Sequence, residues 1–313
     1  MLMSTLYGAQ NEHGVLKRVI VHRPGPELDR ITPVTAGSFG FTAPVDRRIF
    51  LHEFDALTAA LSSLGVEPVF LTDVLKNDAD ALAYMACRPN MTYTRDLAIV
   101  LDRGVLLMSM MHKGRKGDPW IIQRAMERLG VPIIGSIEPP GFVEGGAILF
   151  LDERKMIVSL CDRATEPAIS QMRDLLLGEH IDELILVPVA EGEIHIDGML
   201  MFLAADFAVA YPPHLDLYPS TIFRKGRQPE HVILTEYLDR HGVTVFPVDE
   251  QEKNTACVNY VTVAPLKVIG YDWAERTHAE VRRRGGSVIG VPGTQLLLGN
   301  AGPHCMTLPL LKN

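Results

Sequence analysis

The sequence predicts an α/β fold in which five ββαβ units form a closed ring, that is, a five-bladed α/β propeller. Apolar hairpin-like pairs begin near residues 97, 147, 199 and 258, so they recur about every fifty residues. Each pair precedes a helical stretch that ends in glycine, and a short β-branched run follows the glycine. Repeats of this size bury their apolar faces against their neighbours, which favours a ring or an array.

The hairpins are predicted from two apolar runs that flank a short polar turn. In the first hairpin the turn falls at Asp102-Arg103-Gly104, and in the second it falls near Asp152-Glu153-Arg154. The four predicted hairpins span Leu97 to Met108, Ala147 to Leu160, Met199 to Tyr211 and Val258 to Gly270.

The helices are predicted from apolar residues at helical spacing. The helix from Arg48 to Leu64 presents such a face, and the helix from Ala164 to Leu177 precedes the strand from Leu184 to Val187. Glycine adopts the left-handed conformation at low cost and so often ends a helix. The glycines predicted to do so are Gly65, Gly130, Gly242 and Gly285.

Both ends of the chain are needed to complete the ring. Only one strand, Leu16 to His22, precedes the first helix, and the apolar run Cys305 to Leu311 can supply its partner. No linker rich in serine and glycine divides the chain, so we predict one domain over residues 1–313.

The composition is typical of a soluble globular protein, with 47% hydrophobic and 22% charged residues. The net charge of −8 and the lack of long single-sign runs argue against a nucleic-acid partner. We expect no signal peptide and no membrane segment, since no apolar run approaches about 20 residues. The four cysteines form no C-x-x-C pair, which favours free thiols in the cytoplasm. The sequence leaves open whether the chain forms a homo-oligomer.

Polar clusters occur at matching places in the units, just before or at a hairpin. Equivalent positions in a ring face the same centre, so the chemical side chains of these clusters are expected to converge on one pocket. They are Asp96, Glu144, His195, Asp197 and Cys305.

Such a pocket suits attack by a thiolate on a bound planar cation. Cys305 would react as thiolate, and His195 could lower its pKa, protonate a leaving amine or activate water. Grouped carboxylates bind a guanidinium in bidentate fashion. Fixed carboxylates and an aimed thiolate would overcome the low reactivity of the guanidine carbon by positioning and charge.

The same residues resemble the guanidine-modifying superfamily with the pentein fold, and most of all the arginine deiminases. The matching stretches are Asn90 with Thr94-Arg95-Asp96, Glu144-Gly145-Gly146, His195-Ile196-Asp197, and a terminal loop that ends in His304-Cys305-Met306. The opening stretch from Gly14 to Gly25 is also similar, so the resemblance spans nearly the whole chain.

The resemblance implies a role for each residue. Cys305 would form a covalent amidino intermediate, and His195 would act first as general acid and then as general base. Asp96 and Asp197 would hold the guanidinium, and Glu144 would support His195. The resemblance also implies that the substrate carboxylate is bound by Asn90, Arg115 and Arg163, and that no metal or organic cofactor takes part.

One departure from the deiminase pattern affects the choice of reaction. The family usually has Glu-Gly-Gly-Asp, whereas Ala147 occupies the Asp position here. The leading hypothesis is hydrolysis of L-arginine to citrulline and ammonia. The alternatives are an arginine dihydrolase, a dimethylarginine hydrolase, an amidinotransferase, and a non-catalytic ring protein of the kind that binds a ribosomal subunit. Arg115, which lies beside Gly114 and Lys116, could also be a solvated loop charge.

Overall fold

The computed structural model describes residues 6–313, which form an α/β structure of several small sheets. Four sheets follow the predicted pattern of an antiparallel hairpin with a parallel third strand after a helix. One contains β3 (Ala98–Leu101), β4 (Gly104–Leu107) and β5 (Ile133–Ser136). The others contain β6 (Ile148–Asp152), β7 (Lys155–Leu160) and β8 (Glu183–Pro188); β9 (Leu200–Ala204), β10 (Phe207–Ala210) and β13 (Thr244–Pro247); and β14 (Val261–Ala264), β15 (Lys267–Tyr271) and β16 (Ser287–Val291).

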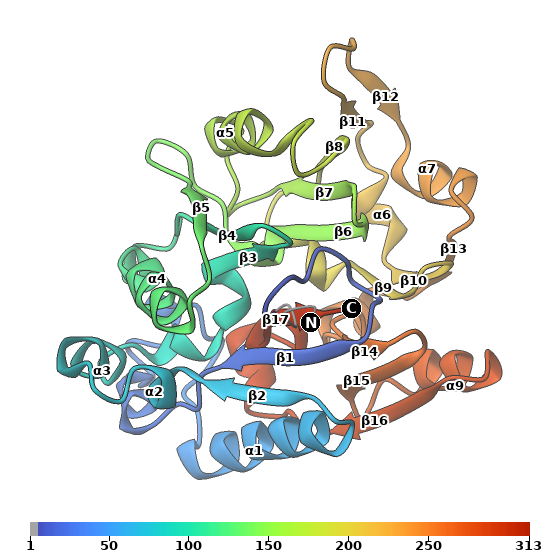
Figure 1. The fold of residues 1–313 in the computed structure, drawn as a ribbon. Helices are drawn as coiled ribbons and strands as arrows, with labels where there is room; N and C mark the ends of the chain where they lie inside the picture. The colour runs from blue at the N-terminus through green and yellow to red at the C-terminus, as the bar shows by residue number, and fades with distance from the viewer. Residues whose placement is uncertain (1–5) are drawn as a thin grey trace, which may run out of the picture.

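The remaining sheet joins the two ends of the described chain, as the sequence predicted. β17 (Leu308–Lys312) pairs antiparallel with β1 (Leu16–Val21), which pairs in parallel with β2 (Glu67–Phe70). Cys305 itself lies just outside β17, in a short 3-10 turn. The sheets succeed one another around the middle of the molecule, and the C-terminus lies near that middle (Figure 1).

The four longest helices lie between the second and third strands of the sheets. The longest are α1 (Arg47–Ser63), α4 (Asp118–Leu129), α5 (Glu166–Leu176) and α9 (Glu275–Arg283). Short helices are α2 (Leu71–Val74), α3 (Ala79–Met85), α6 (Pro212–Leu215), α7 (Leu234–Arg240) and α8 (Glu250–Asn254). Gly130 terminates α4, as predicted, and adopts the left-handed conformation with a φ of 69°. None of the helices in residues 6–313 has the length and apolar character needed to cross a membrane.

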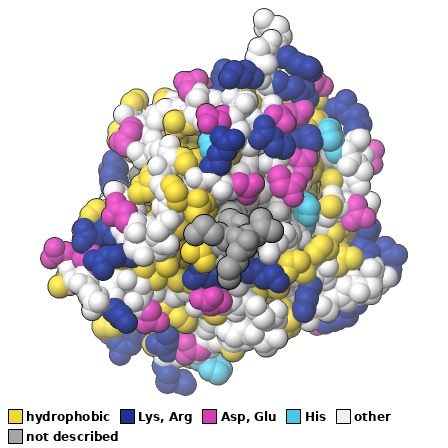
Figure 2. Space-filling model, viewed as in Figure 1, with side chains coloured by type: hydrophobic (Ala, Val, Ile, Leu, Met, Phe, Trp, Pro, Cys, Tyr) yellow, Lys and Arg dark blue, Asp and Glu magenta, His cyan; other side chains and the backbone are white. Residues whose placement is uncertain are grey.

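One hairpin was not predicted. β11 (Ser220–Phe223) and β12 (Glu230–Val232) extend the sheet of β6, β7 and β8 because β11 pairs antiparallel with β8. This hairpin projects from the body of the molecule beside α7 (Figure 1). On the face shown in Figure 2, acidic and basic side chains are interspersed.

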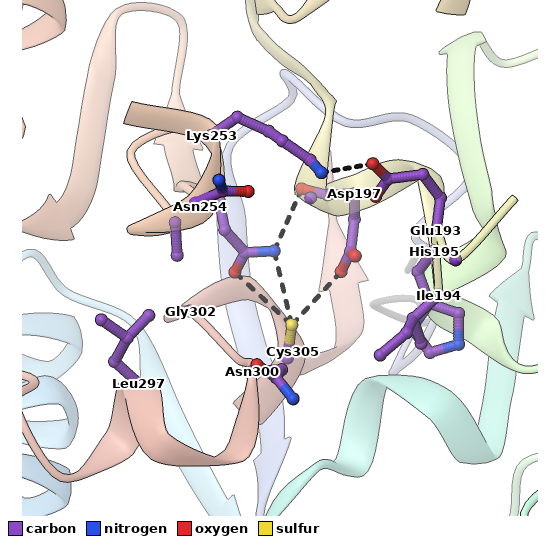
Figure 3. Close-up of a pocket in the computed structure, with 14 residues that line it drawn as sticks. Glu193, Ile194, His195, Asp197, Lys253, Asn254, Leu297, Asn300, Gly302 and Cys305 are labelled. Atoms are coloured by element: carbon purple, nitrogen blue, oxygen red, sulfur yellow. Dashed lines mark hydrogen bonds and ion pairs between the residues drawn. The ribbon is translucent and has the colours of Figure 1, made fainter. Parts of the chain in front are cut away.

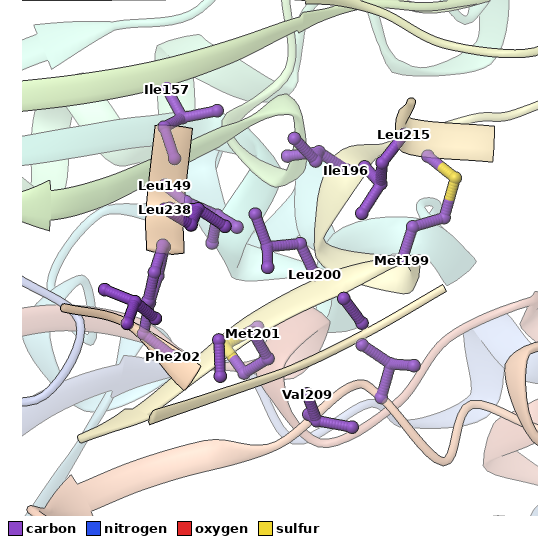
Figure 4. Close-up of a cluster of buried hydrophobic side chains, with 14 of the residues drawn as sticks. Leu149, Ile157, Ile196, Met199, Leu200, Met201, Phe202, Val209, Leu215 and Leu238 are labelled. Carbon is purple, nitrogen blue, oxygen red and sulfur yellow. The ribbon is translucent and has the colours of Figure 1, made fainter. Parts of the chain in front are cut away.

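Apolar side chains fill the space between neighbouring sheets. The largest cluster combines residues of β6 to β10 with residues of α7 and β15, as the repeat pattern requires. Leu200, Phe202 and Val209 in this cluster are fully buried (Figure 4). This packing holds the short turns that lead into each hairpin, and those turns carry the polar clusters.

Candidate active site

Four 3-10 turns carry or adjoin the predicted side chains. Three of them come just before the first strand of a hairpin, and the fourth comes just before β17, which pairs antiparallel with β1. Asp96 lies in η4 (Thr94–Leu97), and Glu144 directly precedes η6 (Gly145–Ala147). His195 directly precedes η7 (Ile196–Gly198), which contains Asp197, and Cys305 lies in η9 (His304–Met306). The turn η4 contacts both η6 and η9, and η6 contacts η7.

The two glycines after Glu144 allow these turns to approach closely. A Cβ on Gly145 would lie 2.1 Å from the carbonyl oxygen of Arg95, and one on Gly146 would lie 2.5 Å from His195 Nδ1. The two glycines are therefore required for the close packing of these turns, and they also form a turn of the chain.

Glu144 and His195 form a hydrogen-bonded pair at the back of the site. His195 Nε2 lies 3.1 Å from Glu144 Oε2, and Arg163 donates to the same oxygen over 3.0 Å. Burial lowers the pKa of the His195 imidazole, but the charges of Asp96 and Glu144 outweigh burial and raise that pKa above 6.5. Burial alone would raise the pKa of Glu144. However, His195 lowers that pKa through its hydrogen bond and its charge, and the charge of Arg163 lowers it further, so the pKa lies well below its usual range.

Asp96 has one oxygen paired and one available. Its Oδ2 accepts a hydrogen bond of 2.5 Å from Arg115, whereas the buried Oδ1 has no hydrogen-bond partner within the described residues and lies 3.7 Å from His195 Nδ1. A buried acceptor without a partner is costly, so Oδ1 is suited to receive an N–H group of a ligand.

Cys305 is buried beside Asp197. Its Sγ lies 3.5 Å from Asp197 Oδ2, and that oxygen also lies 2.8 Å from His304 Nδ1. Burial, together with the charges of Asp197 and Asp96, raises the pKa of the Cys305 thiol well above 9.0. The group at rest is therefore a thiol, and a cation in the pocket would favour the thiolate.

Two adjoining cavities open onto Cys305 and His195. The larger one, about 290 Å³, is lined by Asp197 and by the Glu193–Lys253 ion pair (Figure 3). The smaller one, about 30 Å³, is lined by Asp96, Asn90 and Arg163, among others. Every predicted site residue except Glu144 and Arg115 thus lines a cavity that reaches the sulfur.

The predicted carboxylate-binding residues occupy different environments. Asn90 donates a hydrogen bond of 2.8 Å to the carbonyl oxygen of Phe39, and Arg163 is partly exposed at the small cavity. Arg115 is 1% exposed and is fully engaged by Asp96, Asp118 and the carbonyl oxygen of Tyr93. It is neither a solvated loop charge nor a lining residue, and this geometry favours positioning of Asp96 over the predicted contact with a substrate carboxylate.

Sequence reasoning missed a group of buried residues behind the nucleophile. Glu12 Oε2 lies 3.6 Å from His304 Nε2, Lys312 donates to the Glu12 carbonyl oxygen over 2.6 Å, and Arg95 is buried nearby. It also missed Asn259, which contacts Cys305. Asn259 lies two residues before β14, and this position before a hairpin matches that of the predicted clusters, so the repeat itself could have identified it.

Asp96, Glu144 and His195 bring ligand atoms within 4.8 Å of one another, a spacing that would also suit a metal ion. However, the ligand atoms of Glu144 and His195 already bond one another, and Arg163 is bonded to the same Glu144 oxygen. The expectation of a site without a metal stays a prediction.

Comparisons with known proteins agree on one family. The sequence model of the arginine deiminase family matches residues 57–312. The arginine deiminase of Rhodococcus jostii is 26% identical over 399 aligned positions, which cover 98% of this chain and 97% of that protein. The arginine deiminase of Listeria welshimeri is 26% identical over 72% of this chain, which spans 62% of that relative.

Solved structures show the same fold. A dimethylarginine dimethylaminohydrolase adduct with S-methyl-L-thiocitrulline superposes with a TM-score of 0.71 at 19% identity, over 94% of this chain and 99% of that one. The N-terminal domain of a cyanobacterial arginine dihydrolase gives a TM-score of 0.72 at 15% identity, over 94% and 97% of the two chains. These likenesses establish the pentein fold for this chain.

Proposed function

Because the chain belongs to the arginine deiminase family of guanidine-modifying hydrolases, we propose that it hydrolyses L-arginine to citrulline and ammonia through a covalent intermediate on Cys305. One observation carries the proposal. The Cys305 thiol and the His195 imidazole face a common cavity whose surroundings hold the carboxylates of Asp96, Glu144 and Asp197.

Asp96 and Asp197 hold the guanidinium in the proposed complex. The unpartnered Oδ1 of Asp96 accepts one N–H group, and Asp197, which lies beside the sulfur, provides the second negative charge. The arrival of the cation offsets the carboxylate charges that keep Cys305 protonated. The thiol then loses its proton to solvent, so the bound substrate promotes formation of its own nucleophile.

His195 transfers protons in both half-reactions. In the first, the thiolate bonds to the guanidine carbon, the bond from that carbon to one terminal nitrogen breaks, and imidazolium protonates the departing amine. In the second, neutral His195 takes a proton from water, the oxygen bonds to the same carbon, and the carbon–sulfur bond breaks to return the thiolate. A raised pKa of His195 keeps the imidazolium available at neutral pH for the first step.

The substrate carboxylate lies toward Arg163 and Asn90 in this proposal, because both side chains line the small cavity next to Asp96. Arg115 does not contact the substrate in this proposal. It positions the carboxylate of Asp96 through their ion pair. The cavity of about 30 Å³ must widen to receive the tail of an amino acid.

We also propose that residues 1–313 form one catalytic domain, a five-bladed propeller with this site at its hub. Support comes from the repeated sheet pattern, from the β1–β17 closure, and from the equivalent positions of the four 3-10 turns.

Product analysis tests the reaction. The enzyme is incubated with arginine alone, and the small molecules and the protein are examined by mass spectrometry. We expect citrulline, ammonia and an adduct on Cys305. Ornithine with carbon dioxide would indicate a dihydrolase instead, and turnover only after addition of an amine would indicate an amidinotransferase.

Substitution of the nucleophile provides the second part of the test. Cys305→Ser should abolish turnover, because the hydroxyl cannot form the thiolate that attacks the guanidine carbon. Cys87→Ser, at an exposed cysteine outside the site, is the matched control and should retain normal activity. Normal turnover in Cys305→Ser would refute the proposed function.

A further inference from the structure

Asn259 is a buried amide in contact with the proposed nucleophile. It lies between α8 and β14 and is 2% exposed. Its Nδ2 lies 3.4 Å from Cys305 Sγ and donates a hydrogen bond of 3.0 Å to the carbonyl oxygen of Asp197. Figure 3 shows the sulfur within this group of hydrogen bonds.

The orientation of the amide follows from its other partners. The backbone N–H of His304 donates to Asn259 Oδ1 over 3.0 Å, and a backbone N–H can only donate. The Asp197 carbonyl can only accept, so it requires the Nδ2 end. The two backbone bonds therefore identify the Nδ2 end, whose N–H group lies 3.4 Å from the Cys305 sulfur, whereas Oδ1 lies 3.6 Å from the sulfur and accepts from the thiol.

The loop before Cys305 is shaped around this amide. A Cβ on Gly302 would lie 2.4 Å from Asn259 Oδ1 and 2.5 Å from its Cβ. Gly302 therefore leaves room for the side chain of Asn259.

The sulfur needs such donors because its other neighbours oppose a negative charge. Burial and the carboxylates of Asp197 and Asp96 raise the pKa of Cys305, whereas the Gly302 backbone and Asn259 lower it. Among the described side chains, Asn259 is the hydrogen-bond donor that the structure places on this sulfur.

We propose that Asn259 is a further catalytic residue, which donates its Nδ2–H to the Cys305 thiolate and stabilises it during attack and during release. The proposal rests on the proposed function, which takes Cys305 as the nucleophile. A donor fixed in advance costs no reorganisation when the charge forms, as in an oxyanion hole.

Two substitutions at Asn259 distinguish loss of the N–H donor from loss of side-chain packing. Asn259→Asp keeps the shape and the acceptor for the His304 N–H but replaces the donor with a carboxylate oxygen. Asn259→Ala removes both ends of the amide. Thr262→Val is the matched control, because Thr262 is also buried and loses a single hydrogen bond, to the carbonyl oxygen of Phe202, away from the sulfur.

The readouts are kcat, KM for arginine, and the rate of Cys305 alkylation by iodoacetamide as a function of pH, followed on the Cys305 peptide by mass spectrometry. We expect kcat to fall about tenfold to a hundredfold in Asn259→Ala with little change in KM. The midpoint of alkylation should rise by about one pH unit, and Asn259→Asp should be affected more strongly.

A normal kcat and an unchanged alkylation profile in folded Asn259→Ala would overturn the proposal. So would full activity in Asn259→Asp, because the donor would then be dispensable. Either result, combined with loss of turnover in Cys305→Ser, would leave the proposed function intact. If Asn259→Asp fails to fold, the alkylation profile of Asn259→Ala decides alone.

Discussion

The carboxylate of Glu144 bonds both His195 and Arg163, so it acts on the proposed proton donor and on a residue of the proposed substrate pocket. Its own position follows from complete burial at the start of η6. A charge so placed cannot be screened by solvent, and it therefore acts strongly on the imidazole beside it.

Replacing Glu144 with Gln should lower the pKa of His195. Gln keeps the shape and a hydrogen-bonding group but removes the negative charge that offsets burial of the imidazolium. The midpoint of the His195 NMR titration should shift down by about one pH unit or more, and kcat should fall because less imidazolium is present at neutral pH. An unshifted midpoint, with the signal assigned by comparison with His195→Gln, would show that Glu144 does not set this pKa.

Arg163→Ala should weaken binding of arginine more than binding of a guanidine that lacks a carboxylate, such as agmatine. A charged hydrogen bond to the carboxylate is lost only with arginine, so its KM should rise about tenfold or more. The exposed Arg154, which pairs with Asp182, provides the control variant Arg154→Ala. Equal losses for both substrates would assign Arg163 to the support of Glu144 alone.

The sequence was informative about residues whose chemistry repeats along the chain. Asp96, His195 and Cys305 were recognisable because each lies in a polar cluster at a matching place in its unit. The ion pairs of Arg115 with Asp96 and Asp118 could not be predicted, because they depend on a loop conformation that spacing does not specify. Glu12 and Lys312 were missed because they meet only when the two ends of the chain pair.

At the scale of elements, the short turns before the hairpins determine the geometry of the site. Each is held by the apolar hairpin that follows it, and apolar periodicity is the pattern that sequence reveals most reliably. This is why the four hairpins were predicted correctly. The β11–β12 hairpin was missed because β12 has a single buried residue and so has no apolar pattern.

Gly146→Ala should disable the site without unfolding the sheets. The added Cβ would lie 2.5 Å from His195 Nδ1, so the imidazole must move by roughly an ångström to reach ordinary contact distance. A displacement of that size can reduce kcat about a hundredfold. Steady-state kinetics would measure it, with thermal unfolding to verify the fold. Gly37→Ala, which adds a Cβ in open space, is the control, and a normal kcat in Gly146→Ala would contradict the packing argument.

At the scale of the whole molecule, Glu12 links segments that are far apart in the chain. Its side chain accepts a hydrogen bond from the backbone N–H of Phe150 and faces His304, while its backbone binds Lys312. Burial raises the pKa of Glu12, but His304, Arg95 and Lys312 outweigh burial and lower that pKa from 4.5 to about 2.

This lowered pKa makes a prediction about acid stability. The folded state holds the Glu12 proton less tightly than the unfolded state, so the stabilisation is complete above pH 4.5 and is lost as the pH falls toward 2. It corresponds to about 3 kcal/mol. In Glu12→Gln, the free energy of unfolding measured with urea should depend less on pH in this range, whereas the exposed control Glu236→Gln should follow the parent. An identical acid dependence in Glu12→Gln and the parent would contradict the prediction.

The pairing of β1 with β17 also bears on how the protein is made. During translation β17 leaves the ribosome after every other strand described here, so β1 cannot form its antiparallel pairing before that stage. The turn that carries Cys305 directly precedes β17 and emerges at the same stage. A nascent chain therefore has the carboxylates and the imidazole of the site before Cys305 can join them.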